Sequence, residues 1–203
     1  MTGDAGSGET NARRYMIEND LVEAIIALPE KMFYNTGIGT FIWVLSNRKE
    51  ERRKGKIQLI DATAIKTPLR KNMGEKNCEL SPAQRQEIVR IFMAFEESEV
   101  SRIFPNSEFG YWKVSVQQPL LDEQGNPALD KKGRIQPDKA KADTEIIPFR
   151  YEGGIEAFMD AEVRPYAPGA YIDPKATTIG YELRFTKSFT SLGSFAPCKR
   201  LST

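Results

Sequence analysis

Hydrophobic and polar positions follow regular spacings over the first third of the chain. Apolar residues recur at helical spacing within 9–19, which predicts a short helix. The run 21–28 is largely apolar and is stopped by Pro29, as expected of a strand buried on both faces. The apolar runs 41–45 and 57–60 predict a second and a third buried strand. These elements indicate one edge of a three-layer α/β sheet.

Two later segments carry the pattern of amphipathic helices. The clearer one is 81–97, where Ser81 and Gln84 have the spacing of a capping box and the apolar residues share one face. Packing of that face on a core is its ordinary interpretation. The second is 155–163, which Pro165 stops. The carboxy-terminal part is therefore expected to be mainly helical.

The patterns divide the chain into two regions. Residues 1–65 hold the sheet elements, and 66–203 form a helical carboxy-terminal extension. A polar stretch at 118–143, rich in turn signals, is expected to be either a hairpin excursion or a mobile loop. Because so few strands cannot form a sheet alone, we interpret 1–65 as part of a larger domain.

Composition excludes several kinds of chemistry. The 203 residues contain no histidine, which removes Ser-His-Asp and Cys-His catalysis and histidine-ligated metal sites. The 29 basic and 28 acidic residues nearly cancel, so any DNA contact must be local. Cys78 and Cys198 are too few for a disulfide framework or a cysteine-rich zinc site, which fits a cytoplasmic protein. No apolar run approaches the roughly 20 residues of a membrane helix, so we expect no membrane partner.

The glycine-rich segment 3–10 imitates two nucleotide-binding loops. As a phosphate-binding P-loop it fails, because Glu9 stands where that loop needs a lysine. As a donor-binding turn of a methyltransferase it lacks the preceding strand, since only three residues come before Asp4. The remaining interpretation is a loop that runs into the amino terminus of a helix, where free backbone N–H groups could at most hold a phosphate.

The order of several short motifs resembles the modification subunits of Type I restriction-modification systems, a family that methylates adenine N6. The motifs that carry the resemblance are Gly3-Asp4-Ala5-Gly6-Ser7-Gly8-Glu9, Ile17-Glu18-Asn19-Asp20, Glu23-Ala24-Ile25-Ile26-Ala27-Leu28-Pro29, Phe33-Tyr34-Asn35-Thr36-Gly37-Ile38 and Leu59-Ile60-Asp61-Ala62-Thr63. Looser matches continue to Gly180-Tyr181-Glu182. The sequence departs from the family at Gly169, where an aspartate is expected, and after Phe189.

The resemblance implies a fold and an activity for the parent protein. Residues 1–65 would be the carboxy-terminal edge of a class I methyltransferase-type, Rossmann-like sheet. The intact subunit would use S-adenosylmethionine to methylate adenine in DNA. Its partners would be a specificity subunit, a restriction subunit and DNA, and a separately encoded amino-terminal half is a further candidate.

The catalytic motif of the family is not found in these 203 residues. The family uses an Asn-Pro-Pro-Phe or -Tyr turn to accept hydrogen bonds from the adenine amine, whereas the only Asn-Pro pair here is Asn126-Pro127, followed by Ala128-Leu129. We therefore expect the chain to hold no catalytic, donor-binding or metal-binding residues and to be inactive alone. The alternative is a non-catalytic binding module, or a gene remnant, that docks on a specificity subunit.

One part of the active site is expected within the chain. In related adenine methyltransferases the loop between the last two strands places an aromatic side chain against the base flipped out of the duplex. By this resemblance Phe33 is the first candidate and Tyr34 the second. The alternative is that Phe33 is an ordinary core residue that closes the end of the sheet.

The basic run 48–56 has two interpretations. Its lysine and arginine side chains could contact DNA phosphates or a partner subunit, but Glu50 and Glu51 interrupt it. Short mixed-charge runs are more often solvated connectors, which is the interpretation we favour.

Overall fold

The chain divides into two compact units, each built from segments that are distant in the sequence. A computed structural model describes residues 5–183 and 185–189. The first unit comprises Met1–Leu21, Asn47–Lys56 and Pro105–Leu183, and the second comprises Val22–Ser46, Ile57–Phe104 and Arg184–Thr203. Both units contain segments from before and after residue 65, where the sequence pattern placed a boundary. The division of the chain into 1–65 and 66–203 therefore stays a prediction.

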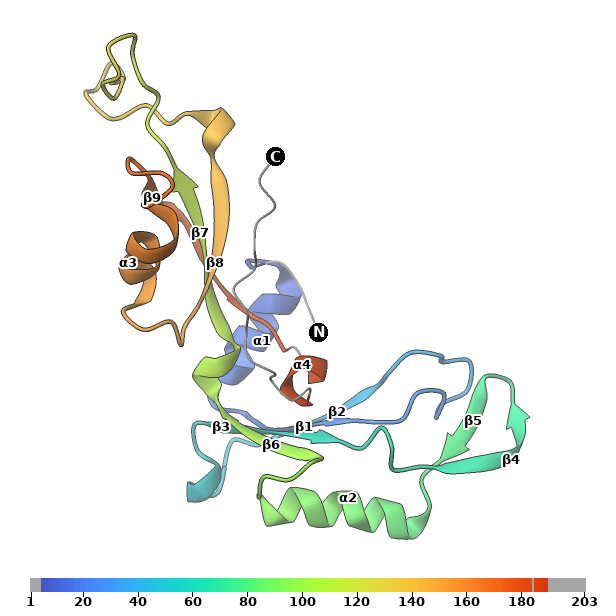
Figure 1. The fold of residues 1–203 in the computed structure, drawn as a ribbon. Helices are drawn as coiled ribbons and strands as arrows, with labels where there is room; N and C mark the ends of the chain where they lie inside the picture. Colours follow the sequence, from blue (N-terminus) through green and yellow to red (C-terminus); the bar gives the residue numbers. More distant parts are fainter. Residues whose placement is uncertain (1–4, 184, 190–203) are drawn as a thin grey trace. The chain divides into compact units, whose positions relative to one another are not determined.

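The second unit contains a four-stranded sheet in the order β2-β1-β3-β6 (Figure 1). The strands are β1 (Val22–Ala27), β2 (Phe41–Leu45), β3 (Lys56–Asp61) and β6 (Ser101–Pro105). β1 is antiparallel to β2 and parallel to β3. Ile25 and Ile60 are fully buried, as expected of apolar strands in the middle of a sheet. The predicted strands at 21–28 and 57–60 are thus confirmed.

β2 differs from the buried strand that its sequence predicts. It forms an edge of the sheet, and Phe41, Ile42 and Leu45 are exposed. The ring of Phe41 lies 5.3 Å from that of Phe185 in the short helix α4 (Phe185–Phe189). The prediction of burial was wrong because composition reports what a strand can bury, and not whether a neighbouring strand is there to cover it.

Helix α2 (Pro82–Ala94) forms as its capping signals predict. Ser81 accepts a hydrogen bond from the Gln84 amide at 3.2 Å, and the Gln84 side chain accepts one from the Ser81 amide at 2.9 Å. The apolar face of α2 places Ile88 in a core cluster with Ile26 and Ile60. The same unit contains a hairpin that the sequence pattern did not reveal, formed by β4 (Thr67–Met73) and β5 (Lys76–Glu79).

The first unit is built around a three-stranded antiparallel sheet in the order β8-β7-β9 (Figure 1). Its strands are β7 (Gly110–Gln117), β8 (Asp143–Pro148) and β9 (Tyr171–Tyr181). The helix α3 (Gly154–Phe158) continues into the π-helix η4 (Met159–Val163) at the segment predicted to be helical, and Met159 is fully buried against Val114 and Ile147.

Helix α1 (Gly8–Glu18) belongs to the same unit and packs beside β9. The buried guanidinium of Arg13 donates from Nε to the carbonyl of Tyr181 at 3.0 Å. Burial, and then the charge of Glu18 and a 3.3 Å hydrogen bond to its carboxylate, raise the pKa of Tyr181 to about 12. The helix expected within 9–19 is confirmed.

Residues 66–183, which make up most of the expected carboxy-terminal extension, are not mainly helical. Within 66–183, strands β4 to β9 form most of the regular structure, while helices are confined to α2, α3 and short 3-10 and π turns. The prediction was wrong because amphipathic helices carry a local signal, whereas short strands are stabilised by partners far away in the chain. The polar stretch 118–143 is a hairpin excursion, with isolated bridges at Pro119–Pro137 and Leu129–Ile135.

Candidate nucleic-acid interface

The segment that carries the two aromatic candidates is a closed loop between β1 and β2. A hydrogen bond from the Leu28 amide to the Thr40 carbonyl, at 2.9 Å, joins its two ends. Lys31 and Asn35 adopt left-handed backbone conformations with φ of 57° and 53°. Such conformations are uncommon for residues other than glycine, and they turn the chain sharply on either side of the aromatic pair. We call residues 29–40 the aromatic loop.

The aromatic side chains of this loop point away from the core. Phe33 is 45% exposed and Tyr34 58% exposed. Their neighbour Met32 is instead partly buried against the core cluster that contains Ile26 and Leu28. Within the second unit, Met32 therefore fills the position that the core interpretation had given to Phe33. An exposed ring is a requirement for stacking on a base, and whether Phe33 does so stays a prediction.

Tyr34 contacts the hairpin formed by β4 and β5. Its hydroxyl lies 3.6 Å from the Met73 sulfur, and the Lys76 ammonium lies 5.2 Å from the centre of its ring. A cation at that distance is attracted by the negative face of the ring. Tyr34 is thus held against the hairpin.

The hairpin also supports the backbone of the aromatic loop. The Asn77 amide donates to the Lys31 carbonyl at 3.0 Å, and the Cys78 thiol lies 3.4 Å from the Glu30 carbonyl. At Gly37 the loop approaches the hairpin so closely that a Cβ would lie 2.8 Å from Oε2 of Glu75. This support was missed at the level of sequence, although Gly74, at φ 65° in the turn of the hairpin, was an available signal.

The basic run 48–56 is more ordered than a solvated connector. Lys49 and Arg53 are buried. Arg52 pairs with Glu50 at 2.7 Å and Lys54 pairs with Glu51 at 2.6 Å. The interpretation as a fully solvated run was therefore wrong at its two buried members, and the acidic residues that interrupt the run neutralise part of its charge.

Lys49 is held in the first unit by Asp20. Its ammonium lies 2.5 Å from Oδ1 of Asp20 and donates to the Lys56 carbonyl at 2.9 Å. The same carboxylate accepts from the Asn106 side chain at 2.8 Å and from the Gly55 amide at 2.9 Å. Partial burial alone would raise the pKa of Asp20, but these hydrogen bonds and the charge of Lys49 outweigh burial and lower it.

The glycine-rich segment 3–10 and the Asn126-Pro127 pair were compared above with nucleotide-binding loops and a catalytic turn. In the part of the chain that the structure describes, both have structural roles. Ser7 caps α1 and accepts from the Thr10 amide at 3.4 Å, which agrees with a loop running into a helix. Residues 1–4 lie outside the described part of the chain. Asn126 lies in a turn in which its amide donates to the Asp122 carboxylate at 2.8 Å. The prediction that Asn126-Pro127 is a turn is confirmed.

Metal-binding chemistry has no support in the described residues. Among residues 5–183 and 185–189, no group of histidine, cysteine and carboxylate side chains has the arrangement of a metal site. Cys78 is a buried free thiol, and Cys198 lies outside the described residues together with the tail after Phe189. None of the described helices is long and apolar enough to cross a membrane.

Comparison with known proteins finds methylase subunits of Type I restriction enzymes among the relatives of this chain. The family model described as N-6 DNA Methylase matches residues 4–115. The Type I restriction enzyme MjaIX methylase subunit of Methanocaldococcus jannaschii is 33% identical over 112 residues, which are 55% of this chain and 19% of that protein. The MjaVII methylase subunit of the same organism is 47% identical over 58 residues, 29% of this chain and 10% of that protein. The matched segments thus span only about a tenth to a fifth of these relatives.

A solved structure from the same class of proteins is also similar. The type I restriction-modification methyltransferase subunit from Streptococcus thermophilus has a TM-score of 0.42 and 21% identity, and the match covers 51% of this chain and 20% of that one.

Proposed function

The chain belongs to the N-6 DNA methylase family, as its resemblance to Type I modification subunits predicted, and from this premise we propose that it is the carboxy-terminal part of such a subunit. The intact subunit transfers a methyl group from S-adenosylmethionine to adenine N6 in DNA. The observation that carries the proposal is the family match over residues 4–115, which includes the aromatic loop.

In this proposal Phe33 stacks on the extruded adenine, and Tyr34 is the second candidate. Three features support this role: the exposure of both rings, the burial of Met32 beside them and the hydrogen bonds that hold the loop on the hairpin. A stacking residue must hold its position before the base arrives, because a mobile ring would lose entropy on binding. The hairpin holds the Tyr34 ring and the Lys31 backbone of this loop in place.

In this proposal the donor site lies outside this chain. S-adenosylmethionine supplies the methyl group when it is bound, but the described residues do not fit it. Within the described residues, Ser7 caps α1 and its hydroxyl donates to that of Thr10. Asn126-Pro127 forms a surface turn. We therefore propose that the isolated chain neither binds the donor nor methylates DNA, and that the missing groups come from the rest of the subunit.

Calorimetry on the purified chain tests the placement of the donor site. Titration with S-adenosylmethionine should give no heat of binding, because affinity in the micromolar range, about 8 kcal/mol, needs a formed pocket. Methyl transfer to DNA should be absent from the chain alone and should appear when the amino-terminal part of the subunit and the specificity subunit are supplied. Donor binding by the chain alone would overturn the proposed division of labour.

A second function has some support from the first unit. The 118–143 hairpin exposes Leu121, Leu129 and Ile135, which suits a docking element for another protein chain. If the chain is a non-catalytic module or a gene remnant, it should bind a specificity subunit while methyl transfer never appears on reconstitution. In the proposed function, by contrast, the intact subunit binds the specificity subunit and is active, and a restriction subunit joins this complex.

A further inference from the structure

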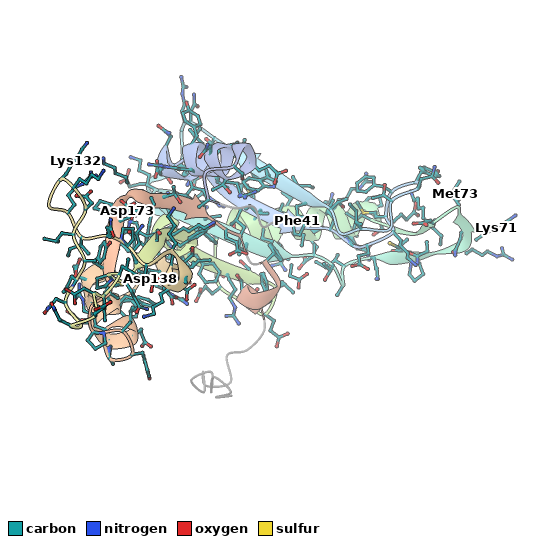
Figure 2. All side chains as sticks on the ribbon, turned by 90° about the horizontal axis from the view of Figure 1, so that it is seen from above. Phe41, Lys71, Met73, Lys132, Asp138 and Asp173 are labelled. Atoms are coloured by element: carbon teal, nitrogen blue, oxygen red, sulfur yellow. The ribbon has the colours of Figure 1, made fainter. Side chains whose placement is uncertain are left out.

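The β4–β5 hairpin carries cationic side chains that are free of internal ion pairs. Arg70 and Lys71 are consecutive on β4, and both are exposed. Neither is paired with a carboxylate among the residues that the structure describes. Figure 2 shows Lys71 and Met73 together at the outer end of the hairpin, with the Lys71 side chain directed outward.

Several basic side chains elsewhere in the chain are already neutralised by carboxylates. Arg52 and Lys54 have glutamate partners, and Lys49 is buried against Asp20. In the 118–143 hairpin, Arg134 pairs with Asp130 at 2.8 Å. Cations that are already neutralised contribute little to attracting a polyanion, so Arg70 and Lys71 are better candidates than these four. Lys131 and Lys132 are also exposed, but it is the β4–β5 hairpin that contacts the aromatic loop.

The hairpin is rigidly connected to the aromatic loop within the second unit. The hydrogen bond from Asn77 to Lys31 joins the two backbones, and Tyr34 touches both Met73 and Lys76. The exposed cations of β4 are therefore held at a fixed offset from Phe33 and Tyr34. In duplex DNA, a base to be flipped likewise lies at a fixed distance from the phosphates that flank it.

We propose that the β4–β5 hairpin is a contact for the phosphate backbone of duplex DNA, with Arg70 and Lys71 binding phosphates near the nucleotide that the aromatic loop meets. This inference rests on the proposed function, because it takes DNA as the substrate. Arginine binds phosphate through its planar fork and lysine as a point charge. Such contacts position the duplex without reading its sequence, which leaves recognition to another chain.

Salt dependence of DNA binding by the 203-residue chain tests the hairpin directly. A fluorescent mixed-sequence duplex is titrated with the wild type and with the double variant Arg70→Gln/Lys71→Gln over a series of salt concentrations. Loss of two phosphate contacts should reduce the slope of log K against log salt by about 1.8. With each tenfold dilution of salt, the affinity of the wild type should therefore rise roughly 60-fold more than that of the variant.

A matched control removes the same charge elsewhere. Lys131→Gln/Lys132→Gln alters two exposed lysines of the 118–143 hairpin, of which Lys132 is marked in Figure 2. This variant should retain the wild-type slope. Thermal melts of both double variants should match that of the wild type, because all four side chains are exposed.

Four results would overturn the inference. These are an unchanged slope in the Arg70/Lys71 variant, an equal loss in the control, no detectable DNA binding by the wild type, and tighter binding of an RNA of the same length. Failure of the proposed function would look different: methyl transfer would be absent from the reconstituted wild-type subunit, whatever the salt slopes show. If transfer occurs, the Arg70/Lys71 variant should raise KM for DNA and leave kcat near that of the wild type.

Discussion

Replacing Asp20 by asparagine should destabilise the first unit by removing one charge from a cluster that depends on it. Asparagine is nearly the same size and tolerates the left-handed backbone that Asp20 adopts, with φ of 55°. The substitution therefore leaves the backbone and the steric fit in place. What remains is the Lys49 ammonium, with a side chain only 3% exposed, which among the described residues then keeps its hydrogen bond to the Lys56 carbonyl.

The magnitude follows from the burial of the two partners. Removing one member of a fully buried pair costs about 3–5 kcal/mol, because the other charge stays without compensation. The Asp20 side chain is 31% exposed, so water already screens part of the attraction. We therefore expect a loss of about 2–3 kcal/mol in the free energy of unfolding. The double variant Asp20→Asn/Lys49→Met should recover part of this loss, since it removes the orphaned charge as well.

Urea unfolding followed by tryptophan fluorescence measures the effect. The chain has two tryptophans, so in a Trp43→Phe background only Trp112, on β7 of the first unit, reports the transition. A loss below about 0.5 kcal/mol, the size of an ordinary surface substitution, would refute the reasoning. So would a double variant in which the two single losses simply add.

The pH dependence of the same difference gives an independent check. The pKa of Asp20 is lowered in the folded protein from an ordinary value of 3.8. A carboxyl with a lowered folded pKa stabilises the protein fully above its unfolded pKa, and this contribution is lost as pH falls through the folded pKa. The gap between wild type and Asp20→Asn should thus be constant near neutral pH and should shrink below about pH 4. A gap that widens on acidification would contradict the assigned charge state.

Three further predictions concern the aromatic loop, the sheet edge and the core. Phe33→Ala should leave the melting temperature nearly unchanged because the ring is exposed, while single-turnover methylation by the reconstituted subunit should fall roughly 5- to 150-fold; a variant that loses stability and activity in parallel would exclude stacking. The isolated chain should self-associate through the open edge of β2, and Ile42→Lys should suppress this in light scattering; a wild type that stays monomeric at all concentrations would contradict it. Met159→Ala should cost about 2–5 kcal/mol in urea unfolding because Met159 is fully buried; a cost near zero would show that the site collapses around the smaller side chain.

The sequence alone determined the elements whose signals are local. Helix α2 has its cap, its proline and its apolar face within a single segment, so it forms where the pattern predicts it. The buried strands β1 and β3 are marked by short apolar runs, although such runs cannot say which strand lies beside which. The family motifs, and with them Phe33 and Tyr34 as candidates, also came from the order of residues along the chain.

Only the tertiary structure decided which surfaces are covered and which charges are paired. The apolar segment Phe41–Leu45 became an exposed edge because exposure depends on neighbouring strands, and Lys49 became buried because Asp20, distant in sequence, meets it. From Lys113 to Gln117, β7 alternates buried and partly exposed residues, but its partners Asp143–Pro148 and Tyr171–Tyr181 lie beyond any local window. The β4–β5 hairpin and its contacts with the aromatic loop were likewise evident only from the tertiary structure. Pairing across long separations is set by the whole packed chain, and the sequence pattern of one segment does not contain it.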